Sequence, residues 1–272
     1  MTPPPRTVVA PGKVVLLGEY AVLDGAPAIV AAVNRGVRCE VSAGNGRSTP
    51  GDERFVRAAL EGAPKRFYAF LDDNPVLGLQ GKPGFGGSAA ATVAALLAAD
   101  LPPERAYAIH ERVQGGGSGI DVFASIHGGV HRFRDGTELP CPPILAVWSG
   151  QSAATGPRVL RYLEYEGRAT FVAASTALVD AFATEPILAL REAYALLRGM
   201  AAEAGLDYDL PAFQAISMLA RMYGGAAKPS GAGGGDIAVA AFPDTDARAA
   251  FTKAAVAQGL VPIAVEIAAG AG

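Results

Sequence analysis

The hydrophobic pattern of the first third of the chain is that of short strands. Between residues 7 and 41, apolar runs alternate with turn residues, and over 37–41 apolar and charged residues alternate one by one. A period of two is typical of strands, so we expect a strand meander here. A loop rich in Gly, Ser and Pro follows at 44–51. A short helix is then expected at 53–60, and a second alternation predicts a strand at 67–71.

The pattern then changes to helices. Residues 88–99 are rich in alanine and contain no internal Gly or Pro, which predicts a helix that begins directly after a glycine run. Two more helices are expected at 104–114 and 121–127, each ended by glycines. The remaining elements are expected to be strands at 129–133 and 144–148, helices at 155–182, 186–204 and 211–223, a strand at 237–242, a helix at 244–258 and a strand at 261–267. This mixed order predicts an α+β fold with one boundary near residue 150.

Composition and charge narrow the class of protein. The 272 residues include 23 Lys and Arg against 26 Asp and Glu, so the formal net charge is −3. Because no basic excess is present to neutralise a phosphate backbone, nucleic acid is not an expected partner. Half of the residues are hydrophobic and 18% are charged, a balance typical of chains that fold on their own.

Cysteine and histidine usage gives no sign of a metal centre. Cys39 and Cys141 are the only cysteines, and no CxxC spacing exists, so neither a disulfide framework nor a zinc cluster is expected. His110, His127 and His131 lack metal-site spacing and are expected at the surface or at helix ends. The chain starts without the pattern of a secretion signal, and no apolar run reaches the ~18 residues of a membrane span. We therefore expect a soluble, cytoplasmic protein.

Three glycine-rich segments carry the candidate chemistry, and the second is the most informative. Residues 84–90 (GFGGSAA) lead straight into the alanine-rich helix. Free amides at a helix N-terminus carry roughly half a positive charge, and glycines let a ligand approach the backbone, so this junction suits a phosphate group. Glycines that serve only helix packing would give the same pattern. No GK[ST] follows, which excludes a Walker loop, and no acidic residue stands at the spacing of a dinucleotide fingerprint.

Taken alone, the other two segments are weaker evidence for a binding or catalytic site. In the first, Lys13 follows Pro-Gly at the start of an apolar strand, and Glu19 stands just past its end; a lysine at such a turn is usually solvated. The third, KPSGAGGGD at 228–236, is a costly run of glycines unless a bare backbone is needed there. Because an apolar strand follows it at once, a flexible linker is a poor explanation.

In this order, the three segments resemble the GHMP kinase family, named for galactokinase, homoserine kinase, mevalonate kinase and phosphomevalonate kinase. The similarity extends over essentially the whole chain. Tyr20 stands where mevalonate kinases usually have His, and Val122 stands where they usually have Asn; both departures favour the phosphomevalonate kinase branch. The segments most similar to that branch are 18–25 (GEYAVLDG), 114–129 (QGGGSGIDVFASIHGG), 148–153 (WSGQSA) and 228–236.

The resemblance implies a GHMP kinase fold. Its N-terminal part would be an α/β domain like domain 2 of ribosomal protein S5, with a left-handed crossover, at residues 1–147. Its C-terminal part would be a ferredoxin-like domain at 148–272, with the active site in the cleft between the two.

The resemblance also implies an activity, namely ATP-dependent phosphorylation of (R)-5-phosphomevalonate to (R)-5-diphosphomevalonate in the mevalonate pathway, by a monomer or homodimer. ATP phosphates would bind the backbone of Gly84, Gly86, Gly87, Ser88, Ala89 and Ala90, and the Ser88 hydroxyl would help to hold Mg²⁺. The family pattern commonly has two serines here, and Gly87 replaces the first. The alternatives are mevalonate kinase, another small-molecule GHMP kinase, or a non-catalytic nucleotide-binding member of the fold.

Lys13 and Asp121 are the candidate catalytic residues. Asp121 matches the family aspartate that acts as a base or orients the attacking oxygen, and Lys13 matches the lysine beside it. A lysine there would lower the pKa of the aspartate and stabilise charge on the transferred phosphoryl group. An acceptor phosphate is already ionised near neutral pH, so orientation matters more than proton removal. Without the resemblance, Asp121 would be expected to cap the helix that begins there.

The acceptor is expected to lie among polar residues from all three segments. For Glu19, a structural hydrogen bond is an equally good interpretation, and Ser152 would act alone because Ala154 stands where Ser or Thr is common. Trp148 is expected to serve packing. The candidate acceptor-binding residues are Lys13, Glu19, Tyr20, Lys82, Ser118, Asp121, Ser149, Ser152, Ser230, Gly231, Ala232 and Gly233.

Overall fold

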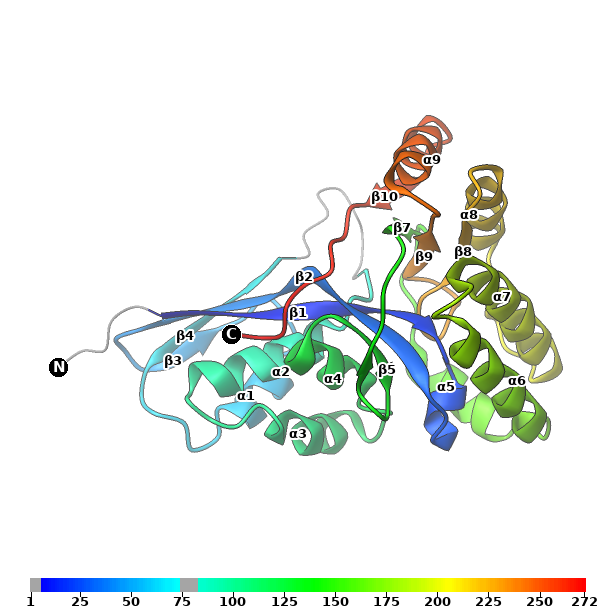
Figure 1. Ribbon diagram of the computed structural model, residues 1–272. Coiled ribbons are helices and arrows are strands. Elements are labelled where there is room, and N and C mark those ends of the chain that lie inside the picture. The colour runs from blue at the N-terminus through cyan, green and yellow to red at the C-terminus, as the bar shows by residue number, and fades with distance from the viewer. Residues whose placement is uncertain (1–5, 74–82) are drawn as a thin grey trace.

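The computed structural model describes residues 6–73 and 83–272 and contains two β-sheets, each with helices packed against it (Figure 1). Lys82, a candidate acceptor-binding residue, lies outside the described residues.

The first sheet is built on two long antiparallel strands, β1 (Arg6–Leu17) and β2 (Ala28–Ser42), joined through the 3₁₀ helix η1 (Ala21–Asp24). Within the described residues, β2 also pairs with β4 and β5, and the outer strands are β3 and β6. Their bounds are β3 (Gly46–Ser48), β4 (Phe67–Asp72), β5 (Val130–Phe133) and β6 (Thr137–Glu138).

Glycines that suggested turns in the predicted meander instead lie within or beside continuous strands. A Cβ atom at Gly12 would lie 1.9 Å from the carbonyl oxygen of Arg35, and one at Gly36 would lie 1.9 Å from that of Ala10. The two strands approach so closely at this point, where the pairing register also shifts, that only glycine fits. The sequence therefore predicted the strands but divided them into too many pieces.

Four helices lie on one face of the first sheet, two in contact with its strands and two packed on those helices (Figure 1). Their bounds are α1 (Glu53–Ala59), α2 (Gly87–Ala98), α3 (Arg105–Gln114) and α4 (Ile120–His127), which confirms the four predicted helices. Helix α2 packs against β1 and β2 on one side and against the other three helices. Its small alanine side chains permit this close approach, and most of them are fully buried.

The second sheet is antiparallel, with strand order β10-β7-β9-β8 in the described residues. Helices α7 and α8 pack against β8 at one edge of this sheet, whereas α9 packs near β10 at the other. The bounds are β7 (Ile144–Trp148), β8 (Ala226–Pro229), β9 (Ile237–Ala241), β10 (Val261–Ile263), α5 (Thr155–Leu163), α6 (Arg168–Ala181), α7 (Pro186–Glu203), α8 (Pro211–Met222) and α9 (Thr245–Ala257).

Three sequence-based expectations were wrong in this half. The helix expected at 155–182 is two helices, because the chain turns after Leu163 and Gly167 caps α6. Strand β8 was missed, since its four residues include a lysine and a proline. The last strand ends at Ile263 rather than at residue 267.

After β10 the chain returns to the first sheet. Isolated bridges join Val33 to Ile267 and Gly128 to Ala269. Val9 and Gly272 exchange backbone hydrogen bonds in both directions, at 2.9 and 3.1 Å. Gly272 therefore lies beside β1 (Figure 1). The division of the chain into two domains at 147/148 stays a prediction. Among the described residues, no helix is both long and apolar enough to cross a membrane.

Candidate active site

The glycine-rich start of α2 has the geometry of an anion-binding turn. Gly84 and Gly86 have φ angles of 86° and 77°, in the left-handed region, and α2 begins at Gly87 with no side chain capping it. The amides of Ala89 and Ala90 donate to the carbonyl of Gly86. Within the described residues, the amides of Gly87 and Ser88 donate to no acceptor. This turn therefore presents free N–H groups at the positive end of a helix.

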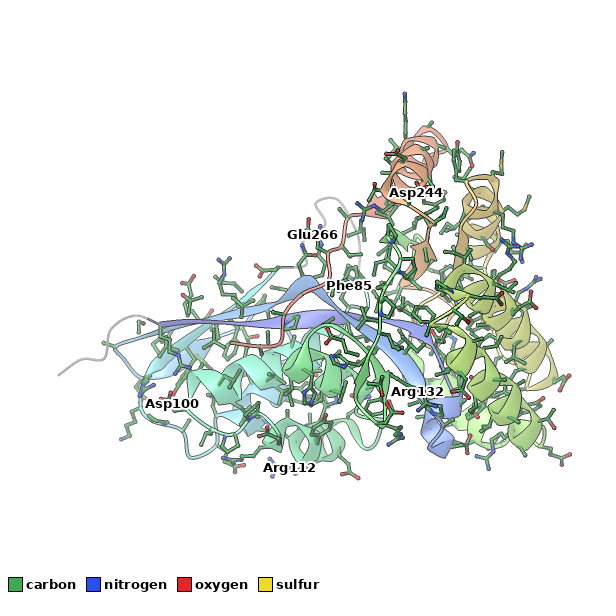
Figure 2. The ribbon with its side chains drawn as sticks, viewed as in Figure 1. Phe85, Asp100, Arg112, Arg132, Asp244 and Glu266 are labelled. Atoms are coloured by element: carbon green, nitrogen blue, oxygen red, sulfur yellow. The ribbon has the colours of Figure 1, made fainter. Side chains whose placement is uncertain are left out.

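Lys13 holds this turn against the first sheet. Its backbone amide donates to the carbonyl of Phe85 at 2.8 Å, and its Nζ donates to the carbonyl of Gly84 at 3.2 Å. Phe85 is almost fully buried in a core that combines residues of both sheets, near the centre of the molecule (Figure 2). The phosphate-binding candidate is thus anchored where the two halves of the fold meet.

Asp121 faces Lys13, as the resemblance to GHMP kinases implied. The Lys13 Nζ lies 3.7 Å from Asp121 Oδ1, and the lysine side chain is 9% exposed against 33% for the aspartate. A Cβ atom at Gly86 would lie 3.1 Å from Lys13 Cγ and 3.5 Å from Asp121 Oδ2. The glycine turn, the lysine and the carboxylate therefore converge on one point.

Asp121 does not cap α4. The helix begins at Ile120, with Gly119 at the N-cap position, and no side chain accepts a hydrogen bond in the capping geometry. The alternative interpretation of Asp121 as a helix cap is therefore wrong. Ser118 accepts a long hydrogen bond of 3.4 Å from the amide of Ile120, which places it in the turn that leads into α4.

The third glycine segment forms a loop, residues 230–236, that is fixed to the first half of the fold. The amide of Val15 donates to Ser230 Oγ at 2.9 Å, and Tyr20 Oη donates to the carbonyl of Ala232 at 2.6 Å. In the described residues, the amides of Ala232, Gly233 and Gly235 have no acceptor. This loop lies between β8 and β9, and its N–H groups without acceptors belong to the half-buried Ala232 and the buried Gly233 and Gly235.

Glu19 and Lys228 form a buried ion pair. Lys228 Nζ donates to Glu19 Oε1 and, at 3.0 Å, to the carbonyl of Pro229, and both side chains are almost fully buried. Burial lowers the pKa of Lys228, and the charge of Glu19 opposes that shift. Glu19 Oε2 is buried without a partner in the described part of the chain. The structural role weighed for Glu19 is therefore present, while a contact with the acceptor stays a prediction.

Asp236 is a site residue that sequence reasoning missed. Its Oδ1 accepts a hydrogen bond from the amide of Ala153 at 3.1 Å, and a Cβ atom on Gly84 would lie 2.8 Å from its Oδ2. Burial raises the pKa of Asp236, while the Ala153 amide and the charges of Lys13 and Arg158 lower it. Its φ angle of 61° is unusual for a residue other than glycine. An acidic residue directly after a glycine run and before a buried strand is the signal that could have found it.

The remaining candidates lie around this centre. The Ser149 amide donates to the carbonyl of Asp236 at 2.9 Å, so the 148–153 segment borders the glycine loop, and Ser152 is exposed. Trp148 is buried in the core, as predicted.

The histidines differ from one another. His127 ends α4, as expected, whereas His110 lies within α3, half-buried beside Phe55. Burial lowers the pKa of His110, and the charge of Asp121 opposes this. No group of three or more metal-ligating side chains exists among the described residues.

Two neighbouring glycines should respond differently to alanine. Gly86→Ala forces a side chain into a left-handed backbone and against Lys13, so we expect turnover to fall by about tenfold or more. Gly87→Ala meets open space at the first position of a helix, so its turnover should stay within about threefold of the parent. Steady-state kinetics on both variants, with melting temperatures as the fold control, make the comparison. Turnover of Gly86→Ala within about threefold of the parent would show that the backbone shape at Gly86 is unimportant.

The curated relatives of the chain are mevalonate and phosphomevalonate kinases. No protein-family model matches the chain. The mevalonate kinase of Archaeoglobus fulgidus is 31% identical over 58% of this chain, and the match spans 63% of that protein. The phosphomevalonate kinase of a Streptomyces species is 29% identical over 88% of this chain and 91% of its own length. The chain thus spans less than two thirds of the first of these relatives.

Solved structures match over nearly the whole chain. The Lin0012 protein of Listeria innocua has a TM-score of 0.83 at 21% identity, covering 98% of this chain and 99% of that one. Streptococcus pneumoniae phosphomevalonate kinase, solved in complex with phosphomevalonate and AMPPNP, has a TM-score of 0.77 at 17% identity, covering 97% and 99%. A mevalonate kinase from Methanococcus jannaschii has a TM-score of 0.79 at 16% identity, covering 97% and 98%. The kinases named among these relatives and structural neighbours are of the GHMP family, and this chain has the GHMP kinase fold.

Proposed function

We propose that this protein is an ATP-dependent kinase of the mevalonate pathway, and that its acceptor is 5-phosphomevalonate. The observation that carries the proposal is the convergence of Lys13 and Asp121 on the glycine turn at the start of α2. The glycine loop 230–236 contacts this turn through Asp236. The relatives support the coarser activity, because two are mevalonate kinases and one is a phosphomevalonate kinase.

The donor nucleotide is assigned to the glycine turn at residues 84–90. The free amides of Gly87 and Ser88, together with the helix behind them, would bind the β- and γ-phosphates of ATP. Phe85 and the backbone of Lys13 keep this turn rigid, so the phosphates would meet preformed donors.

The oxygen ligands present fit Mg²⁺ bound together with a nucleotide. Mg²⁺ usually takes one or two protein oxygens and completes its shell with phosphates and water, so a cluster of three protein ligands is not needed. Ser88 Oγ would be the protein ligand from the first turn of α2, with Asp121 and Asp236 as the nearby carboxylates. When bound, the ion supplies positive charge that offsets the phosphate oxygens.

The reaction joins two phosphates. An oxygen of the acceptor phosphate attacks the γ-phosphorus of ATP, the bond to the β-phosphate oxygen breaks, and ADP leaves with its electron pair. Lys13 would offset the negative charge between the two phosphates, and Asp121 would orient the acceptor and the lysine. No proton needs to be removed from an ionised acceptor, so Asp121 has a positioning role in this reaction.

Mevalonate kinase is the second candidate, favoured by the 31% identity with the Archaeoglobus fulgidus enzyme. Against this candidate, Tyr20 and Val122 stand where mevalonate kinases usually have His and Asn, which favours phosphomevalonate as the acceptor. A mevalonate hydroxyl would need a general base, and Asp121 beside Lys13 is the group in reach of that role.

A substrate panel tests the proposal. Purified protein is given ATP and Mg²⁺ with phosphomevalonate, mevalonate or galactose, and ADP and the phosphorylated product are both measured. We expect turnover of phosphomevalonate to exceed that of mevalonate by about 100-fold in kcat/KM, since the site must hold an additional charged group. Turnover of mevalonate alone would replace the proposal with the second candidate, and ATP binding without any transfer would support a non-catalytic role.

A further inference from the structure

Among the described residues, two cations at the site already have carboxylate partners. Lys13 Nζ lies 3.7 Å from Asp121, and Lys228 is buried against Glu19. An acceptor that carries its own phosphate repels the phosphates of ATP and needs further positive charge close by. Arg158, on α5, is the described residue at the glycine loop that can supply it.

Arg158 lies directly against the glycine loop. A Cβ atom at Gly234 would lie 1.8 Å from Arg158 Nη2 and 2.3 Å from its Cζ, so the guanidinium packs on the bare backbone there. Its Nε donates to the carbonyl of Asp207 at 3.2 Å, and its Nη1 donates to the carbonyl of Ala154 at 2.7 Å. These two neutral acceptors hold the guanidinium in a fixed orientation.

Arg158 forms no ion pair within the described part of the chain. No carboxylate of the described chain lies within ion-pair distance of its nitrogens, and Nη2 donates no hydrogen bond to any described residue. A guanidinium has five N–H donors in a planar fork, and only two of its nitrogens have acceptors here. The half-buried side chain therefore has donors left for an anionic ligand.

The charge of Arg158 affects the pKa values of Tyr20 and Asp236. Burial raises the pKa of Tyr20 and of Asp236, and Arg158 opposes the shift in both cases. Tyr20 belongs to the first half of the fold and donates to the loop carbonyl of Ala232, while Asp236 packs on Gly84. Arg158 is thus close to the residues expected to surround the acceptor.

We propose that Arg158 binds the phosphate group of the acceptor and thereby selects a phosphorylated acceptor over its unphosphorylated counterpart. The inference rests on the proposed function. A guanidinium suits a phosphate because its planar N–H groups match two oxygens at once. The free amides of Ala232, Gly233 and Gly235 provide neutral donors along the same loop.

Binding measurements test this without turnover. Isothermal titration calorimetry of the full chain, with Mg²⁺ and a non-hydrolysable ATP analogue, gives dissociation constants for phosphomevalonate and for mevalonate. Arg158→Gln removes the charge but keeps an amide donor for the neighbouring carbonyls. We expect it to weaken the binding of phosphomevalonate about 10- to 100-fold and the binding of mevalonate less than about threefold. The reason is that a hydrogen bond to a charged group is lost for one acceptor alone.

Two further variants separate this role from a structural one. Arg161→Gln makes the same change of charge on the same helix at an exposed position and should leave both constants unchanged. Arg158→Lys keeps the charge and should recover part of the phosphomevalonate affinity. ATP-analogue affinity and melting temperature should match the parent in all three.

The outcomes are distinguishable. A selective loss for phosphomevalonate in Arg158→Gln supports the inference. Equal losses for both acceptors, or no loss, overturn it, and equal losses would indicate that Arg158 shapes the loop or binds a carboxylate common to both. If the parent protein binds neither acceptor, the proposed function fails, and the role of Arg158 fails with it.

Discussion

Lys13→Met is expected to lower kcat at least tenfold, and by about 100-fold if the lysine acts mainly on the transferred phosphoryl group. Methionine keeps the aliphatic stem that packs under Gly86 but removes the ammonium that donates to Gly84 and faces Asp121. Because a preorganised charge acts where transition-state charge gathers, its loss should appear in kcat more than in the affinity for ATP. Single-turnover and steady-state assays with the best acceptor of the panel provide the measurement.

Asp121→Asn should also lower turnover more than tenfold, because the amide keeps the shape of the side chain but not its charge toward Lys13. Lys253→Met serves as the matched control for Lys13→Met, since Lys253 is exposed on α9, away from both glycine loops. Melting temperatures should stay close to the parent in all three variants. Unchanged turnover in both site variants would remove Lys13 and Asp121 from the mechanism.

The parts of this site that could be predicted from the sequence are those with a local pattern. A glycine run followed by alanines predicts a helix start with free amides, and the structure has that start at Gly87. Lys13 and Asp121 could be paired only through the resemblance to GHMP kinases, because nothing in the spacing of two residues 108 positions apart indicates contact.

The missed parts depend on tertiary contacts. Asp236 could not be linked to Gly84, nor Arg158 to Gly234, from the order of residues alone, since each contact joins segments far apart in the sequence that meet only in the folded chain. Strand β8 was missed for the same reason. A lysine next to a proline indicates a loop until its partner, Glu19, is known to lie beside it.

Lys228→Met is expected to lower the free energy of unfolding by about 3–5 kcal/mol, a large part of the ~5–15 kcal/mol typical of a folded domain. The substitution leaves the Glu19 carboxyl group buried, with Oε1 deprived of its lysine and Oε2 already without a described partner. An unpaired buried charge costs far more than the pair contributes, so the double variant Glu19→Gln with Lys228→Met should recover most of the loss.

Urea denaturation followed by circular dichroism measures these differences, with Lys253→Met expected to stay within about 0.5 kcal/mol of the parent. A loss below about 1 kcal/mol in Lys228→Met would mean that the pair carries little charge in the folded state. The pair also joins the end of β1 to β8, the strand that leads into the glycine loop 230–236. Because Ser230 and Gly231 follow that strand directly, loss of the lysine should loosen the loop and raise the KM of the acceptor more than that of ATP. The same ion pair would then determine both how stably the two halves are joined and how accurately the acceptor is held against the donor phosphate.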